Sequence, residues 1–266
     1  MLCGLIHYNA PGETLEEFLD YAAEAGFEAV ELQCRDVWPE DGDPQAAAAQ
    51  ARALLDARRI KCSAFSAGND FNVWEEDAIQ AQVDRFQRIC DLAVILGAPV
   101  IRTEGGSPKD DCPEELWVTA ISGCVLRCLD AVEEAGLILG IDNHGWITNN
   151  VDVLLTVLET VDSPLVGTNL DTMNYRWFGY PTEVLPYVYE RVAPWVKHTH
   201  FKDGTGSRHD YKGCALGEGE VPIGAAVAAL KAVGYQGVWC AEYEGARDSS
   251  ADGYRRCLAW MRGNCT

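Results

Sequence analysis

The sequence contains no long uninterrupted apolar segment. No run of about 18 apolar residues, the length that crosses a membrane, occurs among its 266 residues. The first eight residues contain neither a basic stretch nor a small-residue cleavage site, so they do not resemble a signal peptide. We therefore expect a cytoplasmic protein without a membrane partner.

Basic residues are scarce. The chain has 21 Lys and Arg against 41 Asp and Glu, which gives a formal net charge of −20. A surface this acidic repels phosphate backbones and anionic lipid surfaces. Nucleic acid is therefore not the expected partner, and the acidity is most simply explained as a solvated surface.

Regular cysteine and glycine motifs are missing as well. The 11 cysteines are odd in number and contain no C-x-x-C pair, whereas disulfide scaffolds and zinc ribbons show regular pairs. Reduced thiols are therefore expected. No G-x-G-x-x-G follows the first apolar run, where residues 9–13 read Asn-Ala-Pro-Gly-Glu. This absence disfavours an open dinucleotide-binding sheet.

Short apolar runs alternate with longer segments of helical periodicity along the whole chain. The expected strands are Leu2–Tyr8, Ala29–Gln33, Ile60–Ser66, Val100–Glu104, Leu137–Asp142, Leu165–Asp171, Val196–Phe201 and Val238–Glu242. The expected helices are Leu15–Ala25, Ala46–Ala57, Asp77–Leu96, Glu114–Ala135, Val151–Val161, Thr182–Val192, Ile223–Val233 and Gly253–Met261. Such alternation predicts parallel strands joined by right-handed crossovers. Eight units in about 250 residues predict a closed (β/α)8 barrel that forms a single domain over residues 1–266.

Histidines gather at the carboxyl ends of the expected strands. Four of the five, His7, His144, His198 and His200, lie at these ends. Active sites of (β/α)8 barrels lie at this end of the barrel. The distribution therefore predicts a functional site there, with a small molecule as the expected ligand.

Three carboxylates and one imidazole end four consecutive strands. Asp142, Asp171, His200 and Glu242 follow strands five to eight. Converging carboxylates repel one another unless a cation or protons neutralise them. Oxygen ligands without a thiolate favour Mn²⁺, Mg²⁺ or Co²⁺ over a structural zinc ion, and we expect one ion, Mn²⁺ first. Such a metal polarises adjacent sugar oxygens and stabilises an ene-diolate.

Five motifs connect the chain to a known family. They are Gly-Phe-Glu-Ala-Val-Glu-Leu, Gly-Ile-Asp-Asn-His-Gly, Gly-Thr-Asn-Leu-Asp-Thr-Met-Asn, Lys-His-Thr-His-Phe-Lys-Asp and Ala-Glu-Tyr-Glu-Gly. Together, and in this order, they resemble the sugar phosphate isomerase/epimerase family of xylose isomerase-like TIM barrels over essentially the whole chain. The resemblance implies that Asp142, Asp171, His200 and Glu242 are metal ligands. It also implies a ketose or keto-sugar substrate, with Glu242 and Asp142 exchanging protons on its two faces.

The chain departs from this family at Asp142, where the family usually has Glu. Asp is one methylene shorter, which puts the proton exchange by two glutamates in doubt. His144 lies two residues further on, on the same side of an extended strand, and its ordinary pKa of about 6.5 suits a base. Some relatives with an acid-Asn-His-Gly motif resemble metal-dependent lyases that act on keto-sugars or keto-glycosides. The first hypothesis is therefore an isomerase or epimerase, and the alternative is a lyase or dehydratase with His144 as base.

Two further classes and one assembly question stay open. The nuclease branch of this fold needs many more histidine ligands and a basic surface, and it is disfavoured by five histidines and a net charge of −20. A non-catalytic barrel that binds a sugar or a protein partner would contain no metal. The exterior helices allow, but do not require, a homo-oligomer.

Other polar residues at the strand ends are candidates for substrate binding. They are His7, Glu31, Glu104, Asn174, His198 and Arg208. Each has a structural alternative. Glu31 and Glu104 are as readily explained as partners of Arg102 or Lys202, and His198 as a hydrogen-bonded residue inside the barrel.

Overall fold

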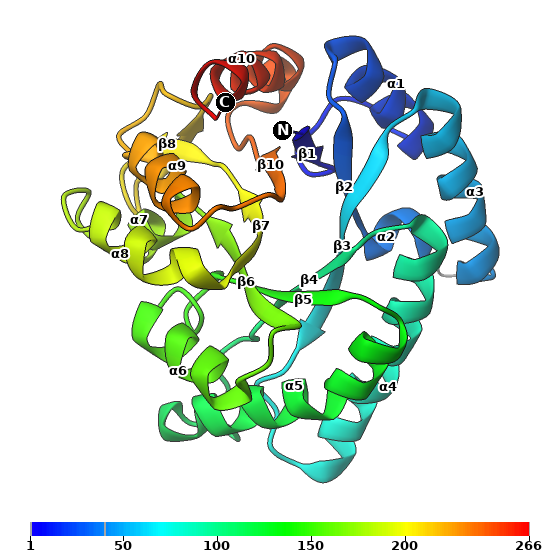
Figure 1. Cartoon of the computed structure of the whole chain (residues 1–266), viewed down its shortest axis with the longest axis vertical. Helices are drawn as coiled ribbons and strands as arrows, with labels where there is room; N and C mark the ends of the chain where they lie inside the picture. The colour runs from blue at the N-terminus through cyan, green and yellow to red at the C-terminus, as the bar shows by residue number, and fades with distance from the viewer. Residues whose placement is uncertain (1, 40, 266) are drawn as a thin grey trace.

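The computed structural model describes residues 2–39 and 41–265, and its centre is an eight-stranded parallel sheet (Figure 1). The strands are β1 (Leu2–Ile6), β2 (Ala29–Gln33), β3 (Lys61–Asp70), β4 (Val100–Glu104), β5 (Ile138–Asp142), β6 (Val166–Asp171), β7 (Val196–His200) and β10 (Val238–Ala241). Their order in the sheet is β10-β1-β2-β3-β4-β5-β6-β7. A parallel bridge between Phe201 and Ala241 joins β7 to β10. The sheet therefore closes into the expected (β/α)8 barrel.

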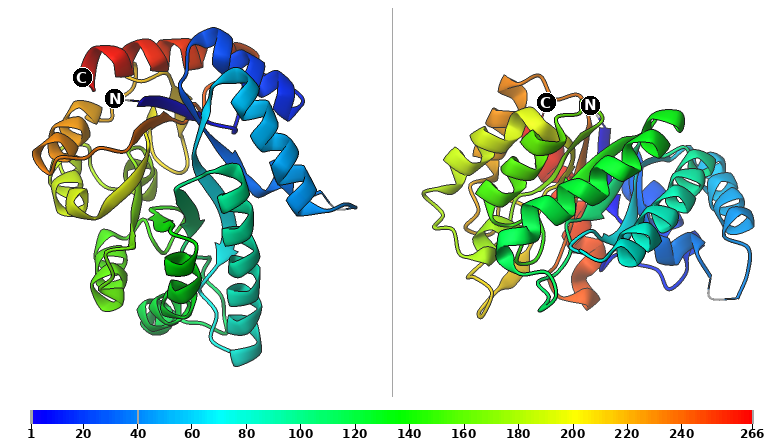
Figure 2. Two further views of the ribbon diagram at one scale, coloured as in Figure 1. Left: turned by 45° about the vertical axis from the view of Figure 1, so that its right-hand side comes forward. Right: turned by 90° about the horizontal axis from the view of Figure 1, so that it is seen from below.

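Helices surround the barrel on its outside (Figure 2). They are α1 (Leu15–Ala25), α3 (Pro44–Arg58), α4 (Glu76–Leu96), α5 (Trp117–Glu134), α6 (Val151–Val161), α8 (Leu185–Val192), α9 (Ile223–Ala232) and α10 (Ser250–Asn264). Short 3-10 turns precede or follow some of them: η1 (Glu114–Leu116), η2 (Ala193–Trp195) and η3 (Arg247–Ser249). Within the described ranges, no helix is both long enough and apolar enough to cross a membrane.

Helix α1 shows how local sequence signals set the element boundaries. Thr14 caps its start, because its hydroxyl accepts from the Glu17 amide at 3.2 Å while Glu17 Oε2 accepts from the Thr14 amide at 3.1 Å. This reciprocal capping box satisfies two amides that have no partner within the helix. At the other end, Gly26 takes the left-handed conformation with φ of 91°. That conformation favours glycine and ends the helix.

Four short elements were not expected from the sequence. They are α2 (Cys34–Val37), α7 (Asn174–Phe178) and the antiparallel hairpin of β8 (Asp203–Thr205) and β9 (Lys212–Cys214). Each is too short to produce a periodic hydrophobic pattern. They lie in the segments that follow β2, β6 and β7, so they shape the carboxyl end of the barrel.

Strand β3 extends beyond its expected end at Ser66. A register shift lies between Ser66 and Asp70, and it lets Asp70 pair with Glu104 of β4. Gly68 lies within the irregular segment at φ of 61°, a conformation that glycine adopts without strain. An irregularity of this kind leaves no alternating pattern in the sequence, which is why the shorter strand was expected.

Candidate metal centre and active site

Asp171, His200 and Glu242 converge inside the carboxyl end of the barrel. Asp171 ends β6, His200 ends β7 and Glu242 directly follows β10. One potential ligand atom from each lies within 4.8 Å of the others, and all three residues are buried. The structure therefore brings together three of the four ligands that the sequence predicted.

The three residues also present buried atoms without hydrogen-bond partners. Asp171 Oδ2, His200 Nδ1 and Glu242 Oε2 form no hydrogen bond of regular geometry, although His200 Nδ1 and Glu242 Oε2 are 2.8 Å apart and Asp171 Oδ2 lies 2.9 Å from Lys202 Nζ. A buried polar atom without a partner is costly and uncommon. Two carboxylate oxygens and one imidazole nitrogen that face one another suit a divalent cation. The residues present thus fit the metal ion that the sequence predicted.

Lys202 is a buried cation at this centre. Its Nζ lies 2.9 Å from Asp171 Oδ2, 3.4 Å from Glu242 Oε1 and 3.5 Å from Glu244 Oε1. Burial disfavours the charged amine, but these carboxylates outweigh burial and raise the pKa of Lys202 well above its ordinary value. From the sequence, Lys202 was expected only as an ion-pair partner of Glu31 or Glu104. Its position two residues after His200, on the same side of an extended segment, was the available signal.

Burial and neighbouring charges shift the pKa values of Asp171, His200 and Glu242 in different directions. Burial, assisted by Glu242 and Asp142, raises the pKa of Asp171 to about 7. Burial opposes the charged ring of His200, yet Glu31 and Glu242 raise its pKa to about 10. Despite its burial, Glu242 has a lowered pKa because Lys202 and His200 are close. The centre therefore needs positive charge, and binding of a divalent cation would release the His200 proton.

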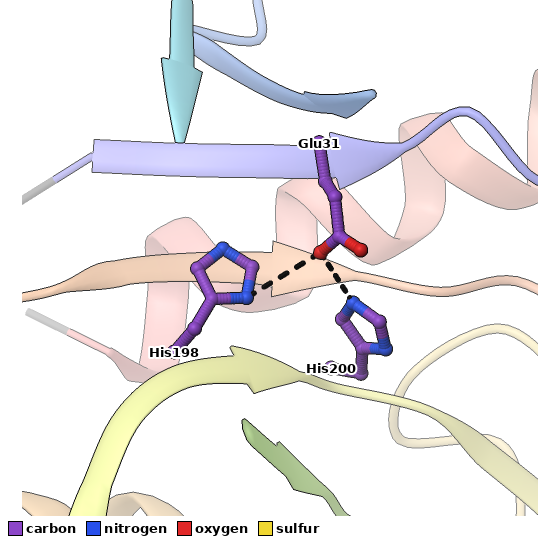
Figure 3. A group of neighbouring side chains, drawn as sticks. All are labelled: Glu31, His198 and His200. Carbon is purple, nitrogen blue, oxygen red and sulfur yellow. Dashed lines mark hydrogen bonds and ion pairs between the residues drawn. The ribbon is translucent and has the colours of Figure 1, made fainter. Parts of the chain in front are cut away.

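Glu31 holds the far side of the His200 ring. Glu31 is 0% exposed, and its Oε2 lies 2.6 Å from His200 Nε2 and 3.5 Å from His198 Nδ1, as Figure 3 shows. Its other oxygen accepts a hydrogen bond from Arg102 Nε at 3.1 Å. A carboxylate on one ring nitrogen leaves the other nitrogen available as a ligand. Glu31 thus directs His200 Nδ1 toward Asp171 and Glu242.

The Glu31→Gln variant is expected to bind divalent metal about 10–100-fold more weakly than the unchanged protein. The amide keeps the shape of the carboxylate but not the charge that orients His200 and supports its basicity. Titration of metal-free protein with Mn²⁺ in a calorimeter measures the effect. Glu24→Gln, an exposed change on α1, is the matched control, and an unchanged affinity in Glu31→Gln would contradict the prediction.

Asp142, the fourth predicted ligand, lies outside the group of three. Its Oδ1 accepts from Asn169 Nδ2 at 2.5 Å, and its Oδ2 lies 3.3 Å from Arg102 and 3.6 Å from His144 Nδ1. Burial would raise the pKa of Asp142, but Arg102 and His144 outweigh it and lower the pKa. Asp142 is therefore an anion that is already bound by cationic neighbours. Its role as a ligand stays a prediction.

A cavity of about 710 Å³ opens beside this centre. It is lined by Tyr8, Asn9, Arg35, His144, Gly145, Asn174, Trp177, Lys202, Tyr211, Glu244, Gly245 and Arg247. Lys202 connects the two regions, because it lines the cavity and contacts the carboxylates of the centre. Of the residues predicted for catalysis or substrate binding, His144 and Asn174 line this cavity.

Glu31, Glu104 and His198 have structural partners. Glu31 and Glu104 both pair with Arg102, at 3.1 and 3.4 Å, which is the structural alternative considered for them. His198 Nδ1 is 3.0 Å from Asn169 Oδ1, and the ring is 1% exposed. Burial lowers the pKa of His198 to about 4, so this ring is neutral. These contacts agree with the structural alternative, and the predicted contact of the three residues with substrate stays a prediction.

His7 and Arg208 are engaged elsewhere. The His7 ring stacks on Phe18 with centroids 4.0 Å apart, and its Nδ1 lies 2.7 Å from Asp36 Oδ1. The Arg208 guanidinium lies over the ring of Trp146, 4.4 Å from its centroid. Among the residues that the structure describes, neither lines the 710 Å³ cavity. Their predicted contact with substrate stays a prediction.

Fold and site together define a (β/α)8 barrel with a buried histidine–carboxylate centre at the carboxyl end of its strands. Residues 19–264 match the model of the xylose isomerase-like TIM barrel family. The chain belongs to this family, as its motifs indicated.

Individual relatives are distant. A 3-dehydroshikimate dehydratase of Pseudomonas putida is 24% identical over 271 residues, which cover 92% of this chain but 39% of the dehydratase. This chain thus spans well under half the length of that relative. A D-allulose 3-epimerase structure from Methylomonas sp. has a TM-score of 0.77 at 18% identity, covering 99% of this chain and 98% of the epimerase. The IOLI protein with a bound zinc atom has a TM-score of 0.82 at 16% identity, covering 100% and 98%. The likeness to these structures confirms the fold.

Proposed function

We propose that the protein is a divalent-metal-dependent enzyme that removes a proton from the carbon beside a carbonyl group of a sugar-like substrate. The observation that carries this proposal is the convergence of three buried potential ligand atoms of Asp171, His200 and Glu242, next to a cavity that is also lined by His144. The metal, Mn²⁺ first, would polarise adjacent substrate oxygens and stabilise the resulting ene-diolate. Its ligands would be these three residues and, through a local adjustment, Asp142.

His144 is the proposed base. It lines the cavity, its side chain is 47% exposed, and its Nδ1 lies 3.6 Å from Asp142 Oδ2. Burial opposes the charged ring, but the carboxylate of Asp142 outweighs burial and raises the pKa of His144. The neighbouring anion therefore makes the ring more basic. Asp142 and Glu242, the acids of the family's proton exchange, are 1% and 7% exposed and do not line the cavity.

A lyase reaction follows if the substrate carries a leaving group on the next carbon. His144 would take the proton, and the resulting imidazolium would return it to a hydroxyl group on the next carbon, which would leave as water and give an unsaturated product. Two observations support this outcome: His144 is the imidazole on the cavity, and the chain is similar to a 3-dehydroshikimate dehydratase.

An isomerase or epimerase reaction follows if the proton is returned instead. That outcome requires a second acid–base group on the cavity, and Glu244, with a side chain that is 22% exposed, provides one. Similar structures include a D-allulose 3-epimerase. The two outcomes share the deprotonation step and differ in what happens to the anion that it produces.

The His144→Ala variant is expected to lose about 10²–10⁴-fold in kcat, because no other imidazole lines the described cavity. Its affinity for Mn²⁺ should stay within about twofold of the unchanged protein. Solvent-deuterium exchange into a panel of ketoses, keto-polyols and cyclic keto-acids measures turnover, and calorimetry measures metal binding. His209→Ala, in an exposed loop, is the matched control.

Product analysis by mass and NMR separates the two outcomes. An epimerase or isomerase that uses the proposed deprotonation exchanges one hydrogen for deuterium and loses no other atom, whereas isomerisation without exchange would indicate a hydride shift and contradict the deprotonation. A dehydratase releases one water. Full activity of His144→Ala would exclude His144 as the base. A metal-loaded protein that neither exchanges nor converts any member of the panel would contradict the proposed function.

A further inference from the structure

We propose that the cavity takes a substrate that carries an anionic group, a carboxylate or a phosphate, and that Arg35 and Arg247 bind this group. The inference rests on the proposed function, whose substrate class it narrows. The reacting carbons would lie toward Lys202 and His144, and the anionic end toward the two arginines.

The charge of the cavity lining contrasts with that of the whole chain. Acidic residues outnumber basic ones by 41 to 21 in the sequence, yet the lining contains Arg35, Lys202 and Arg247 against one carboxylate, Glu244. Lys202 is already paired with Asp171, Glu242 and Glu244. The positive charge that remains for a ligand is therefore that of the arginines, whose forked donors match carboxylate and phosphate oxygens.

Neither arginine is neutralised by a carboxylate. Throughout residues 2–39 and 41–265, no acidic side chain forms an ion pair with Arg35 or Arg247. Arg35 makes one hydrogen bond, from its terminal nitrogen to the His7 carbonyl oxygen. By contrast, the nearby Asp36 is paired with His7 at 2.7 Å, and the nearest cationic partner of Glu244 is Lys202 at 3.5 Å.

Arg35 lies in the short helix α2 and Arg247 begins the 3-10 turn η3, and both segments are hydrogen-bonded to the residues that follow β1. Arg35 is tied there by its bond to His7. On the other side, Asn9 Nδ2 donates to the carbonyl oxygens of Tyr243 and Gly245, at 3.1 and 3.0 Å, just before Arg247. Asn9 itself takes a left-handed conformation with φ of 47°, which asparagine tolerates better than most residues. The backbones that carry the arginines are thus held before any ligand binds, which lowers the entropy cost of binding.

The two arginines also line a second, smaller cavity of about 360 Å³. It also contains Glu13 and Asp36, so an anion is repelled there. The larger cavity places the arginines beside the exposed hydroxyl-bearing ring of Tyr8, which is 41% exposed. A volume of about 710 Å³ is ample for a six-carbon sugar acid or sugar phosphate.

Three polyols of equal chain length test the proposal. D-glucitol, D-gluconate and D-glucitol 6-phosphate are titrated into the protein in a calorimeter. The protein is first freed of metal with a chelator, and the chelator is then removed, so that no bound metal can bind the anion. We expect at least one anionic probe to bind ten times or more as tightly as D-glucitol, and the stronger anion identifies a carboxylate or a phosphate. In Arg35→Gln/Arg247→Gln the three affinities should agree within about twofold.

Arg59→Gln/Arg88→Gln, two exposed arginines outside the cavity, removes the same charge and should keep the preference. Equal affinities in the unchanged protein, no binding of any probe, or loss of the preference in this control would overturn the inference. The His200→Ala variant separates anion binding from the metal-dependent reaction, because it should lose metal binding and keep the preference for the anionic probes. Anion binding would then stand even if the proposed reaction failed, and the reaction could stand without it.

Discussion

Replacing His200 by alanine is expected to weaken Mn²⁺ binding by more than about 100-fold and to abolish deuterium exchange. The imidazole provides the nitrogen ligand of the cluster, so its loss should exceed the 10–100-fold effect typical of residues that only orient a ligand. Asp171 and Glu242 would remain as two carboxylates that repel each other. Calorimetric titration and elemental analysis of purified protein measure the change.

The matched control for this variant is His209→Ala, because it removes a histidine from an exposed loop. Urea unfolding of both variants in metal-free buffer separates loss of the ligand from loss of the fold. A His200→Ala protein that is folded and still binds one Mn²⁺ with unchanged affinity would show that the centre is not at Asp171, His200 and Glu242.

Replacing Arg102 by methionine is expected to lower the free energy of unfolding by about 3–5 kcal/mol. The guanidinium lies 3.1 Å from Glu31 and 3.3 Å from Asp142, and both carboxylates are buried. Burial disfavours the charged guanidinium, yet these anions raise the pKa of Arg102. Methionine preserves much of the side-chain volume but leaves the two buried anions without their shared cation. Urea unfolding followed by circular dichroism measures the loss.

The pH dependence of this variant tests the electrostatic cause. Glu31 and Asp142 have lowered pKa values in the folded protein, so their stabilising contribution is present above the ordinary carboxyl pKa of about 4. It is lost as the pH falls through the lowered values. The stability deficit of Arg102→Met should therefore shrink in acid. Arg52→Met, which removes an exposed helical pair with Asp56, should cost about 0.5 kcal/mol or less, and equal losses in both variants would contradict the argument.

Local signals were sufficient for most of the barrel's elements. The boundaries of α1, β2, β4 and α6 agree with the sequence expectation, because caps, glycine stops and hydrophobic periodicity are encoded by neighbouring residues. The β8–β9 hairpin and α7 could not be found in this way. Helix α7 has five residues and each strand of the hairpin has three, which is too short for a periodic pattern to develop.

The proximity of the three proposed ligands was predictable because topology alone brings the ends of consecutive parallel strands together. Asp171, His200 and Glu242 needed only the assumption of a closed barrel. The contact of Glu31 with His200 joins residues 169 positions apart on β2 and β7. No sequence pattern records which side chains meet across the barrel, so the sequence left Glu31 open between a substrate contact and a partner of Arg102 or Lys202, and it did not predict the contact with His200.

The amino-acid sequence determined the barrel, the end of it that contains the proposed site, and the residue types that gather there, since each follows from periodicity, strand order and charge. Only the tertiary structure decided how those charges are distributed. It assigned Arg102 to Glu31 and Asp142, brought Lys202 to Asp171 and Glu242, and left Arg35 and Arg247 on the cavity without an ion pair among the described residues. The reason is physical: Coulomb interactions and hydrogen bonds depend on distances of a few ångströms between side chains, and those distances arise only when all eight strands close.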